Sequence, residues 1–197
     1  REGDRLIRVT LTDGNSQMLV ASYNGKVVRF PEDTVRPMGR TATGVRAIKL
    51  DEDGKDRVVG MICVEEGSKD TVLVISDKGY GKRTLLDDET GEPIYRITNR
   101  GGKGVKTMNL TDKTGNLIGM EAVNDDQDLM LITKSGTAIR MDMSSISVLG
   151  RATQGVKLIE LQKRNDTLMF GCVVPKEETE EATAEEVTAE ETTTTEE

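Results

Sequence analysis

The sequence predicts an all-β protein in which three similar units are arranged like the blades of a propeller, each blade having four strands. Short runs of Val, Ile and Leu alternate with turns that contain glycine, which is the usual signal of β-hairpins. No long stretch has the apolar spacing of an amphipathic helix. The motif Arg-x-x-x-Gly-Val-cation occurs three times, at residues 40–46, 100–106 and 151–157.

Each unit contains a hairpin in which an apolar strand leads through a glycine turn into a second strand. The apolar strands are expected at 18–21, 72–75 and 129–132, the turn glycines are Gly25, Gly79 and Gly136, and the second strands are expected at 26–30, around Lys82 and at 138–141. In the second unit, six extra residues at 87–92 separate the turn from the motif, and we interpret them as a loop insertion.

Two more strands are expected in every unit. One follows the motif glycine, at 45–50, 105–110 and 156–161, and the other opens the unit, at 4–9, 56–61 and 115–120. A further strand of the opening type, at 166–171, has no unit after it. We expect this surplus strand to complete the third sheet or to cover its edge, because an exposed edge invites aggregation.

The position of three arginines predicts a shared basic face. Arg29, Arg83 and Arg140 each lie four residues after a turn glycine. Side chains alternate between the two faces of a strand, so a slip of one residue would move an arginine to the opposite face. The common register therefore predicts that the three arginines lie on equivalent faces of their sheets.

Charge and composition divide the chain into a body and a tail. The net charge is −8, but residues 176–197 hold most of the excess acid, and the rest of the chain is close to neutral. We expect one domain at 1–175, with repeats at about 4–55, 56–114 and 115–175, followed by a disordered acidic tail at 176–197. The tail has too few large apolar residues to order itself.

The residue types that are missing argue against catalysis by this chain, and we expect none. There is no His, and Cys63 and Cys172 are isolated from each other and from any metal motif, so we expect reduced core cysteines. The Walker A order of residues is absent. No apolar run is long enough to span a membrane, and we expect a cytoplasmic protein.

Residues 35–46 and 146–156, with the turn segments 24–30 and 79–84, resemble the C-terminal domain of bacterial DNA gyrase A. The resemblance covers residues 1–175 and extends to the acidic tail. It implies a β-pinwheel, which is a propeller-like disc of four-stranded blades whose basic rim is wrapped by DNA. About three blades are present here, so the chain resembles the C-terminal half of such a disc.

The resemblance also implies partners and a place in the nucleoid. Double-stranded DNA would be wrapped by the domain, which would support ATP-dependent negative supercoiling by an assembly of gyrase A and gyrase B. ATP, Mg²⁺ and the catalytic tyrosine belong to other parts of that assembly, and Tyr23, Tyr80 and Tyr95 lack the surroundings of that tyrosine. Residues 98–104 match only the second half of the family's wrapping signature, Gln-Arg-Arg-Gly-Gly-Lys-Gly, so the full signature is expected upstream.

The candidate DNA-binding residues are the cations in and around the motif, together with two glycines that allow a phosphate to approach closely. Their expected role is to hold the DNA backbone without reading sequence. Ordinary solvated cations are the alternative, and Arg40, Arg100 and Arg151 could instead brace their loops. The candidates are Arg29, Arg36, Arg40, Arg46, Lys82, Arg83, Arg96, Arg100, Gly101, Gly102, Lys103, Lys106, Arg140, Arg151 and Lys157.

Two other functions stay open from the sequence. The equivalent domain of topoisomerase IV is built alike but lacks the wrapping signature and wraps DNA less. A propeller-type scaffold for protein interactions is the candidate from another class, and weak dependence of its binding on salt would favour it.

Overall fold

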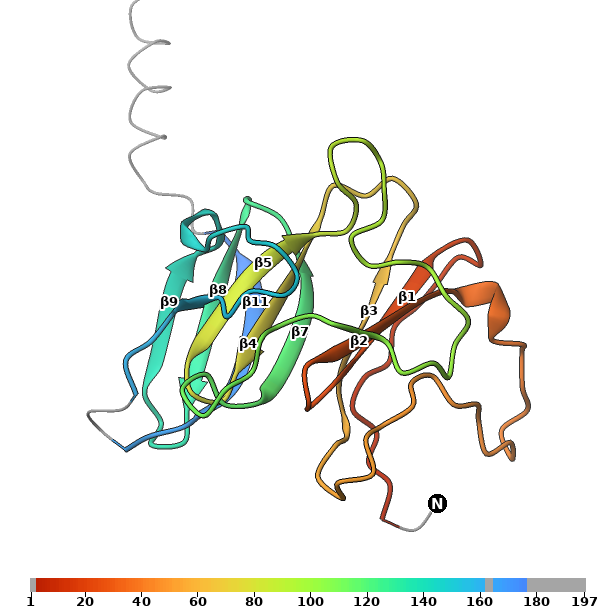
Figure 1. Ribbon diagram of the computed structural model, residues 1–197, viewed down its shortest axis with the longest axis horizontal. Helices are drawn as coiled ribbons and strands as arrows, with labels where there is room; N and C mark the ends of the chain where they lie inside the picture. The colour runs from red at the N-terminus through yellow and green to blue at the C-terminus, as the bar shows by residue number, and fades with distance from the viewer. Residues whose placement is uncertain (1–2, 162–164, 177–197) are drawn as a thin grey trace, which may run out of the picture.

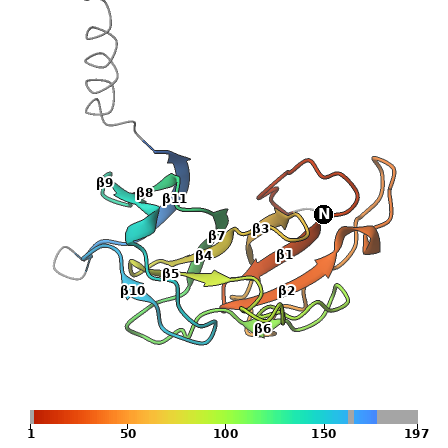
Figure 2. The ribbon, with the colours of Figure 1, turned by 90° about the horizontal axis from the view of Figure 1, so that it is seen from above.

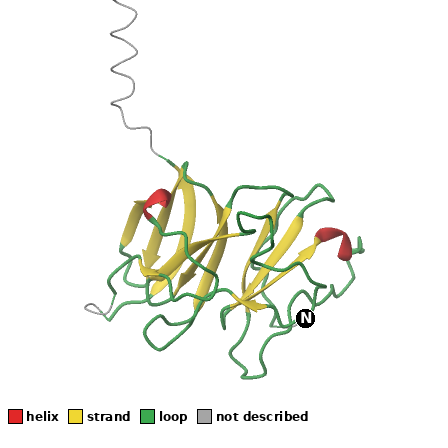
Figure 3. Ribbon diagram, turned by 45° about the horizontal axis from the view of Figure 1, so that its top comes forward, coloured by secondary structure: helices red, strands yellow, loops and turns green. Residues whose placement is uncertain are grey.

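The computed structural model describes residues 3–161 and 165–176. It contains three antiparallel sheets that lie side by side (Figure 1), so the predicted all-β class is confirmed. Helical structure in the described residues is limited to two single turns of 3-10 helix, η1 (Glu32–Thr34) and η2 (Met143–Ser145) (Figure 3). Apart from Lys176, the predicted acidic tail lies outside the described residues.

Two sheets have four strands and the third has three. The first sheet has the order β3 (Val58–Val64), β1 (Gln17–Ser22), β2 (Lys26–Pro31) and β6 (Val105–Lys106). The second has the order β10 (Val156–Lys157), β5 (Tyr80–Leu85), β4 (Thr71–Ser76) and β7 (Leu117–Val123). The third has the order β11 (Leu168–Pro175), β8 (Gln127–Thr133) and β9 (Ala138–Asp142).

The predicted hairpins are present in all three sheets. β1 pairs with β2, β4 with β5 and β8 with β9. Gly25, Gly79 and Gly136 sit in the connecting turns with φ of 77°, 79° and 88°. That region of φ costs glycine little and other residues more, which is why the turns could be located from the sequence.

The motif strands do not join the sheets of their own units. β6 follows the second hairpin in sequence but pairs with β2 of the first sheet, with Val105 opposite Val27. β10 likewise pairs with β5 of the second sheet, with Val156 opposite Gly81. The expectation that each unit supplies its own motif strand is therefore corrected: each strand completes the preceding sheet. The boundaries of the three sequence repeats themselves stay predictions.

Several expected strands are shorter or missing. β6 and β10 have two residues each, and 45–50 contributes only an isolated bridge between Ile48 and Gly102. The expected strand at 4–9 is not formed, and Leu6 is 85% exposed. The strands of the same type, β3, β7 and β11, each pair with the hairpin that precedes them, and the described residues contain no hairpin before residue 4. The surplus strand is confirmed as β11, which pairs with β8.

The hydrophobic core lies between the sheets. On the first two sheets, Leu19 and Val27 pack with Val72 and Val74. Successive residues of a strand point to opposite faces, so Leu73 of β4 packs on the other side, in the cluster shared with the third sheet. β4 is therefore buried along its whole length, as expected for a strand in the middle of a stack of sheets.

The arrangement of the sheets gives the molecule two edges. β3 packs against β7, and β7 packs against β11, so these strands form an inner edge. The motif strands β6 and β10 lie at the opposite ends of their sheets. Figure 2 shows β6 and β10 on the lower side, away from β3, β7 and β11. We call the side that carries β6 and β10 the outer edge.

Candidate nucleic-acid interface

The loop that leads into β6 is built from glycines in a close backbone arrangement. Gly101 and Gly104 have φ of 79° and 72°. The N–H of Gly101 donates to the carbonyl of Ala47 at 2.5 Å, and the carbonyl of Gly102 accepts from the N–H of Lys49 at 2.8 Å. These bonds fix the loop on the outer edge and leave the Lys103 side chain exposed.

The motif glycines let this loop dock on the neighbouring strand. A Cβ on Gly104 would lie 2.5 Å from the carbonyl oxygen of Val27, and one on Gly155 would lie 2.7 Å from that of Gly81. Gly44, in the first copy of the motif, has no neighbouring atom within 4 Å of such a Cβ. The second and third copies are therefore docked on a sheet, whereas the glycine of the first copy is not.

Seven of the candidate cations lie at the surface, on the motifs and the segments that precede them. In the second copy, Lys106 contacts Asn109 Oδ1 at 3.5 Å, and a cleft of about 290 Å³ is lined partly by Arg96 and Lys103. Lys157, in the third copy, forms an ion pair with Glu160 at 2.7 Å. These seven are Arg36, Arg40, Arg46, Arg96, Lys103, Lys106 and Lys157, and Arg140 on β9 is exposed as well.

Arg29 and Arg83 are buried, with only 6% of each residue exposed. The Arg29 Nη1 donates to Asp87 Oδ1 at 2.7 Å and to the carbonyl of Tyr95 at 3.3 Å. The Arg83 Nε donates to the carbonyl of Ile146 at 2.9 Å. Their shared register does place them on equivalent faces of their sheets. A segment that returns from the next hairpin covers each of them, which corrects the expectation of an exposed basic face.

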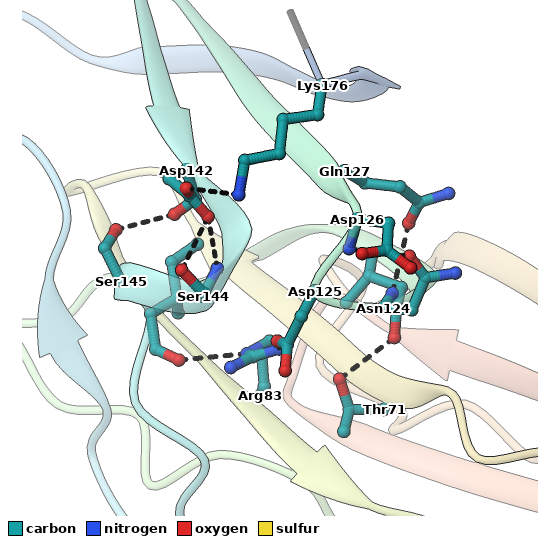
Figure 4. Close-up of polar contacts among 12 residues, drawn as sticks. Thr71, Arg83, Asn124, Asp125, Asp126, Gln127, Asp142, Ser144, Ser145 and Lys176 are labelled. Atoms are coloured by element: carbon teal, nitrogen blue, oxygen red, sulfur yellow. Dashed lines mark hydrogen bonds and ion pairs between the residues drawn. The ribbon is translucent and has the colours of Figure 1, made fainter. Parts of the chain in front are cut away.

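Arg83 has a carboxylate partner as well, because its Nη1 forms an ion pair with Asp125 (Figure 4). Arg140 is more exposed than Arg29 or Arg83. Its Nε donates to Asp128 Oδ2 at 2.7 Å and its Nη2 to the carbonyl of Pro175 at 2.7 Å. All three arginines therefore direct at least two donors to groups of the protein.

Lys82 is fully buried, which also differs from the expected place at the surface. Its Nζ donates to the carbonyls of Gly150 and Arg151 at 2.5 and 2.7 Å. Burial lowers the pKa of Lys82 to about 8, and the charge of Arg151 acts in the same direction. Lys82 therefore binds the backbone of the third motif loop from the interior of the protein.

Arg100 and Arg151 brace backbone, which was the alternative considered for them. The Arg100 Nε donates to the carbonyl of Thr34 at 3.0 Å, and its Nη1 to that of Arg46 at 3.4 Å. The Arg151 Nη1 donates to the carbonyl of Lys106 at 2.6 Å. Each arginine thus ties its own motif copy to the previous copy or to the segment before it.

The partners of the buried arginines do not follow from the sequence. Asp87 falls in the expected loop insertion, and Asp125 lies in a turn rich in polar residues. Asp87 follows the second hairpin, whereas Asp125 comes from the turn between β7 and β8, so the two partners share no position of the repeat.

The described residues hold no group of three or more acidic, Cys or His side chains that could bind a metal ion. Within the same residues, no helix has the length and apolar character needed to cross a membrane. At the outer edge, the exposed cations Lys103 and Lys106 lie beside the glycine backbone of their loop, an arrangement that suits an anionic partner.

Comparison with known proteins gives consistent matches. Residues 17–65, 70–124 and 127–170 match the family described as DNA gyrase C-terminal domain, beta-propeller. DNA gyrase A of Staphylococcus aureus (strain NCTC 8325 / PS 47) is 44% identical over 183 residues, which is 93% of this chain and 20% of that protein. The chain thus spans about a fifth of the length of this relative.

Two solved structures are similar in fold. The C-terminal domain of DNA topoisomerase IV superposes with a TM-score of 0.76 at 21% identity, covering 93% of this chain and 54% of that one. A DNA gyrase A C-terminal domain superposes with a TM-score of 0.69 at 25% identity, covering 81% and 50%. With the family match over most of its length, the chain belongs to the family of DNA gyrase C-terminal β-propeller domains.

Proposed function

We propose that this chain binds double-stranded DNA without sequence specificity and wraps it along the outer edge. The observation that carries the proposal is the docking of two successive motif copies on the outer edges of adjacent sheets, as β6 and β10. Each copy presents exposed cations, Lys103 and Lys106 in one and Lys157 in the other. Contacts repeated from sheet to sheet suit a polymer with a repeating charge.

We assign phosphate contact to the exposed candidates Arg36, Arg40, Arg46, Arg96, Lys103, Lys106 and Lys157. Gly101 and Gly102 would let a phosphate approach the backbone. Arg29, Lys82, Arg83, Arg100 and Arg151 would act indirectly, because their donors hold the loops and sheets that carry the contacts. Arg140 stays a candidate whose contacts are shared with the third sheet.

Wrapping requires DNA to bend along successive sheets. Bending a site of 20–30 base pairs by 40–90° costs on the order of 1–6 kcal/mol, which extra phosphate contacts must offset. We infer that the chain forms part of gyrase A and acts with gyrase B in an assembly with two copies of each. The chain would supply DNA geometry for negative supercoiling, while ATP and Mg²⁺ would act elsewhere in the assembly.

The proposal is tested by removing exposed charge at the outer edge. Arg96→Gln and Lys103→Gln should each weaken binding by a similar factor on unrelated DNA sequences, and each should reduce the slope of log K against log salt by about 1. Lys69→Gln, an exposed lysine in the loop between β3 and β4, serves as the control and should leave both quantities unchanged. Equal effects of all three variants would refute the assignment to the outer edge.

The topoisomerase IV domain is the second candidate, because its fold superposes on this chain with a TM-score of 0.76. The 44% identity to a DNA gyrase A favours gyrase over it. A domain of the topoisomerase IV type would bind DNA with the same salt dependence but change its linking number less. A protein-interaction scaffold would instead bind a protein partner with little effect of salt.

A further inference from the structure

We propose that Arg29 and Arg83 are positioning residues that set the angle between adjacent sheets, and through it the curvature of the DNA path. This inference rests on the proposed wrapping function. Both arginines lie on second strands of hairpins, β2 and β5, and both are 6% exposed. The contacts of each one reach from its own sheet to residues in the segments that connect this sheet with the next one.

Arg29 joins the first sheet to the segment that follows β5 of the second. Within the first sheet, its Nε donates to Gln17 Oε1 at 2.5 Å. Its Nη1 reaches Asp87 Oδ1 at 2.7 Å and the carbonyl of Tyr95 at 3.3 Å. Tyr95 is fully buried in the core between the first and second sheets, so it is a fixed anchor.

Arg83 repeats this arrangement between the second and third sheets. Its Nε donates to the carbonyl of Ile146 at 2.9 Å, and its Nη1 pairs with Asp125 from the turn between β7 and β8. Ile146 lies five residues before the motif arginine Arg151, as Tyr95 lies five residues before Arg100. Both clamps therefore combine a carbonyl at the same repeat position with a carboxylate from a neighbouring loop.

The backbone of the same two arginines holds the segment that crosses to the motif strand. The carbonyl of Arg29 accepts from the N–H of Thr98 at 2.8 Å, and that of Arg83 accepts from the N–H of Leu149 at 2.8 Å. Parallel bridges join Arg29 to Ile97 and Arg83 to Val148. In each case the side chain of one arginine contacts the segment that leads to the next sheet, and its backbone holds the segment that leads to a motif loop.

A guanidinium suits this role better than an ammonium. It is planar and offers several donors in a fixed geometry, so bonds to two groups define an orientation as well as a distance. The two sheets also pack through apolar side chains, but apolar packing is not directional. The arginine contacts are therefore the directional part of the joint between sheets.

The clamps can be weakened from the outside. Asp87 and Asp125 have side chains that are 37% and 68% exposed, so an Asn at either position would remain partly solvated, and both arginines would keep their carbonyl partners. The test variants are Asp87→Asn, Asp125→Asn and their combination. The control is Asp142→Asn, because Asp142 pairs with exposed Lys176 at 2.7 Å within the third sheet region and joins no two sheets (Figure 4).

Three quantities are measured for each folded variant of the 197-residue chain. Salt-dependent affinity for linear duplex DNA reports phosphate contact. The linking-number change per bound chain, obtained by sealing a nicked plasmid with the chain bound, reports the DNA path. X-ray scattering of the free chain reports the spread of sheet arrangements without DNA. Arg83→Lys serves as a second variant, since it keeps the charge and loses the planar group.

The double variant should bind as tightly as the wild type or up to about threefold tighter, because negative charge is removed. Its linking-number change should fall by at least half, and its X-ray scattering should show a broader distance distribution. Arg83→Lys should show the same two changes. Asp142→Asn should match the wild type in linking number. Unchanged linking number and scattering in both the double variant and Arg83→Lys would overturn the proposal.

The result for the wild-type chain separates this inference from the proposed function. A wild type that binds DNA without any linking-number change would contradict wrapping. The comparison of scattering between the free wild type and the variants would then test by itself whether the arginines fix the angle between sheets. A loss of about 1 in the salt slope of Arg83→Gln, which removes the charge, with the linking number per bound chain unchanged, would identify Arg83 as a phosphate contact and reject the positioning role.

Discussion

Lys82 is an ammonium group in a position that the other two hairpins fill with apolar side chains. It lies three residues after its turn glycine, as do Val28 and Ile139. Its Nζ binds the carbonyls of Gly150 and Arg151 rather than a carboxylate. An ammonium held by carbonyls is costly to bury, and the lowered pKa of Lys82 expresses that cost.

Lys82 should make stability depend on pH in the alkaline range. The folded-state pKa is about 8 and the ordinary value is 10.5, so the unfolded chain binds this proton more tightly. Stability should therefore rise with pH between those two values. Compared with Lys82→Met, the wild type should gain about 1–2 kcal/mol of unfolding free energy between pH 7.5 and pH 9.5. Urea titrations at both pH values measure it, and parallel pH profiles of the two proteins would contradict it.

The face of the sheet on which these basic residues lie could be predicted from the sequence, but their exposure to solvent could not. Register placed Arg29 and Arg83 on equivalent faces, which the structure confirms. Whether such a face meets solvent depends on the segments at 95–99 and 146–150, which return from the next hairpin. These segments form hydrogen bonds with residues that are distant in sequence, and the local sequence pattern does not predict such bonds.

At the scale of elements, the motif glycine lets a strand that follows one hairpin in sequence pair with the sheet of the preceding hairpin. Gly104 lies against the Val27 carbonyl, whereas Gly44 has open space around it. The three copies look alike in sequence, and the Gly-Val-cation pattern does not specify a partner strand. The sequence therefore predicts the strand but not the sheet that it completes.

Gly104→Ala should be more destabilising than Gly44→Ala, although both residues have positive φ. At Gly44 only the cost of the left-handed backbone applies, about 1 kcal/mol. At Gly104 the added Cβ would also meet backbone at 2.5 Å, which raises the total to about 2–4 kcal/mol. Thermal or denaturant unfolding of the two variants measures the difference. Equal losses of stability would contradict the docking of β6.

At the scale of the whole molecule, hairpin position, turn residues and sheet number followed from the sequence, while strand exchange did not. The surplus strand at the C-terminal end was predicted because its pattern repeats the opening strands, and β11 confirms it. The segment at 4–9 has the same pattern, but strands of this type pair with the hairpin before them, and the described residues contain no hairpin before residue 4. Pairing partners, rather than local propensity, decide which of these segments become strands.

The chain should be inert as a catalyst. This prediction rests on the proposed function, in which the chain supplies DNA geometry, and on a sequence without the Walker A order of residues. Purified chain should neither hydrolyse ATP nor cleave or relax plasmid DNA, with or without Mg²⁺. Phosphate release and plasmid relaxation assays measure this. ATPase activity that co-purifies with the chain and disappears on a point mutation within it would overturn the expectation.

The salt dependence of DNA binding tests the central claim most directly. If each of the three motif copies offers about two phosphate contacts, the slope of log K against log salt should be about −5, with little preference among unrelated duplexes. Binding is measured on linear duplexes of unrelated sequence at several salt concentrations. A slope of about −5 on every duplex is the result that the account predicts. A slope near zero, or strong preference for one short site, would contradict it.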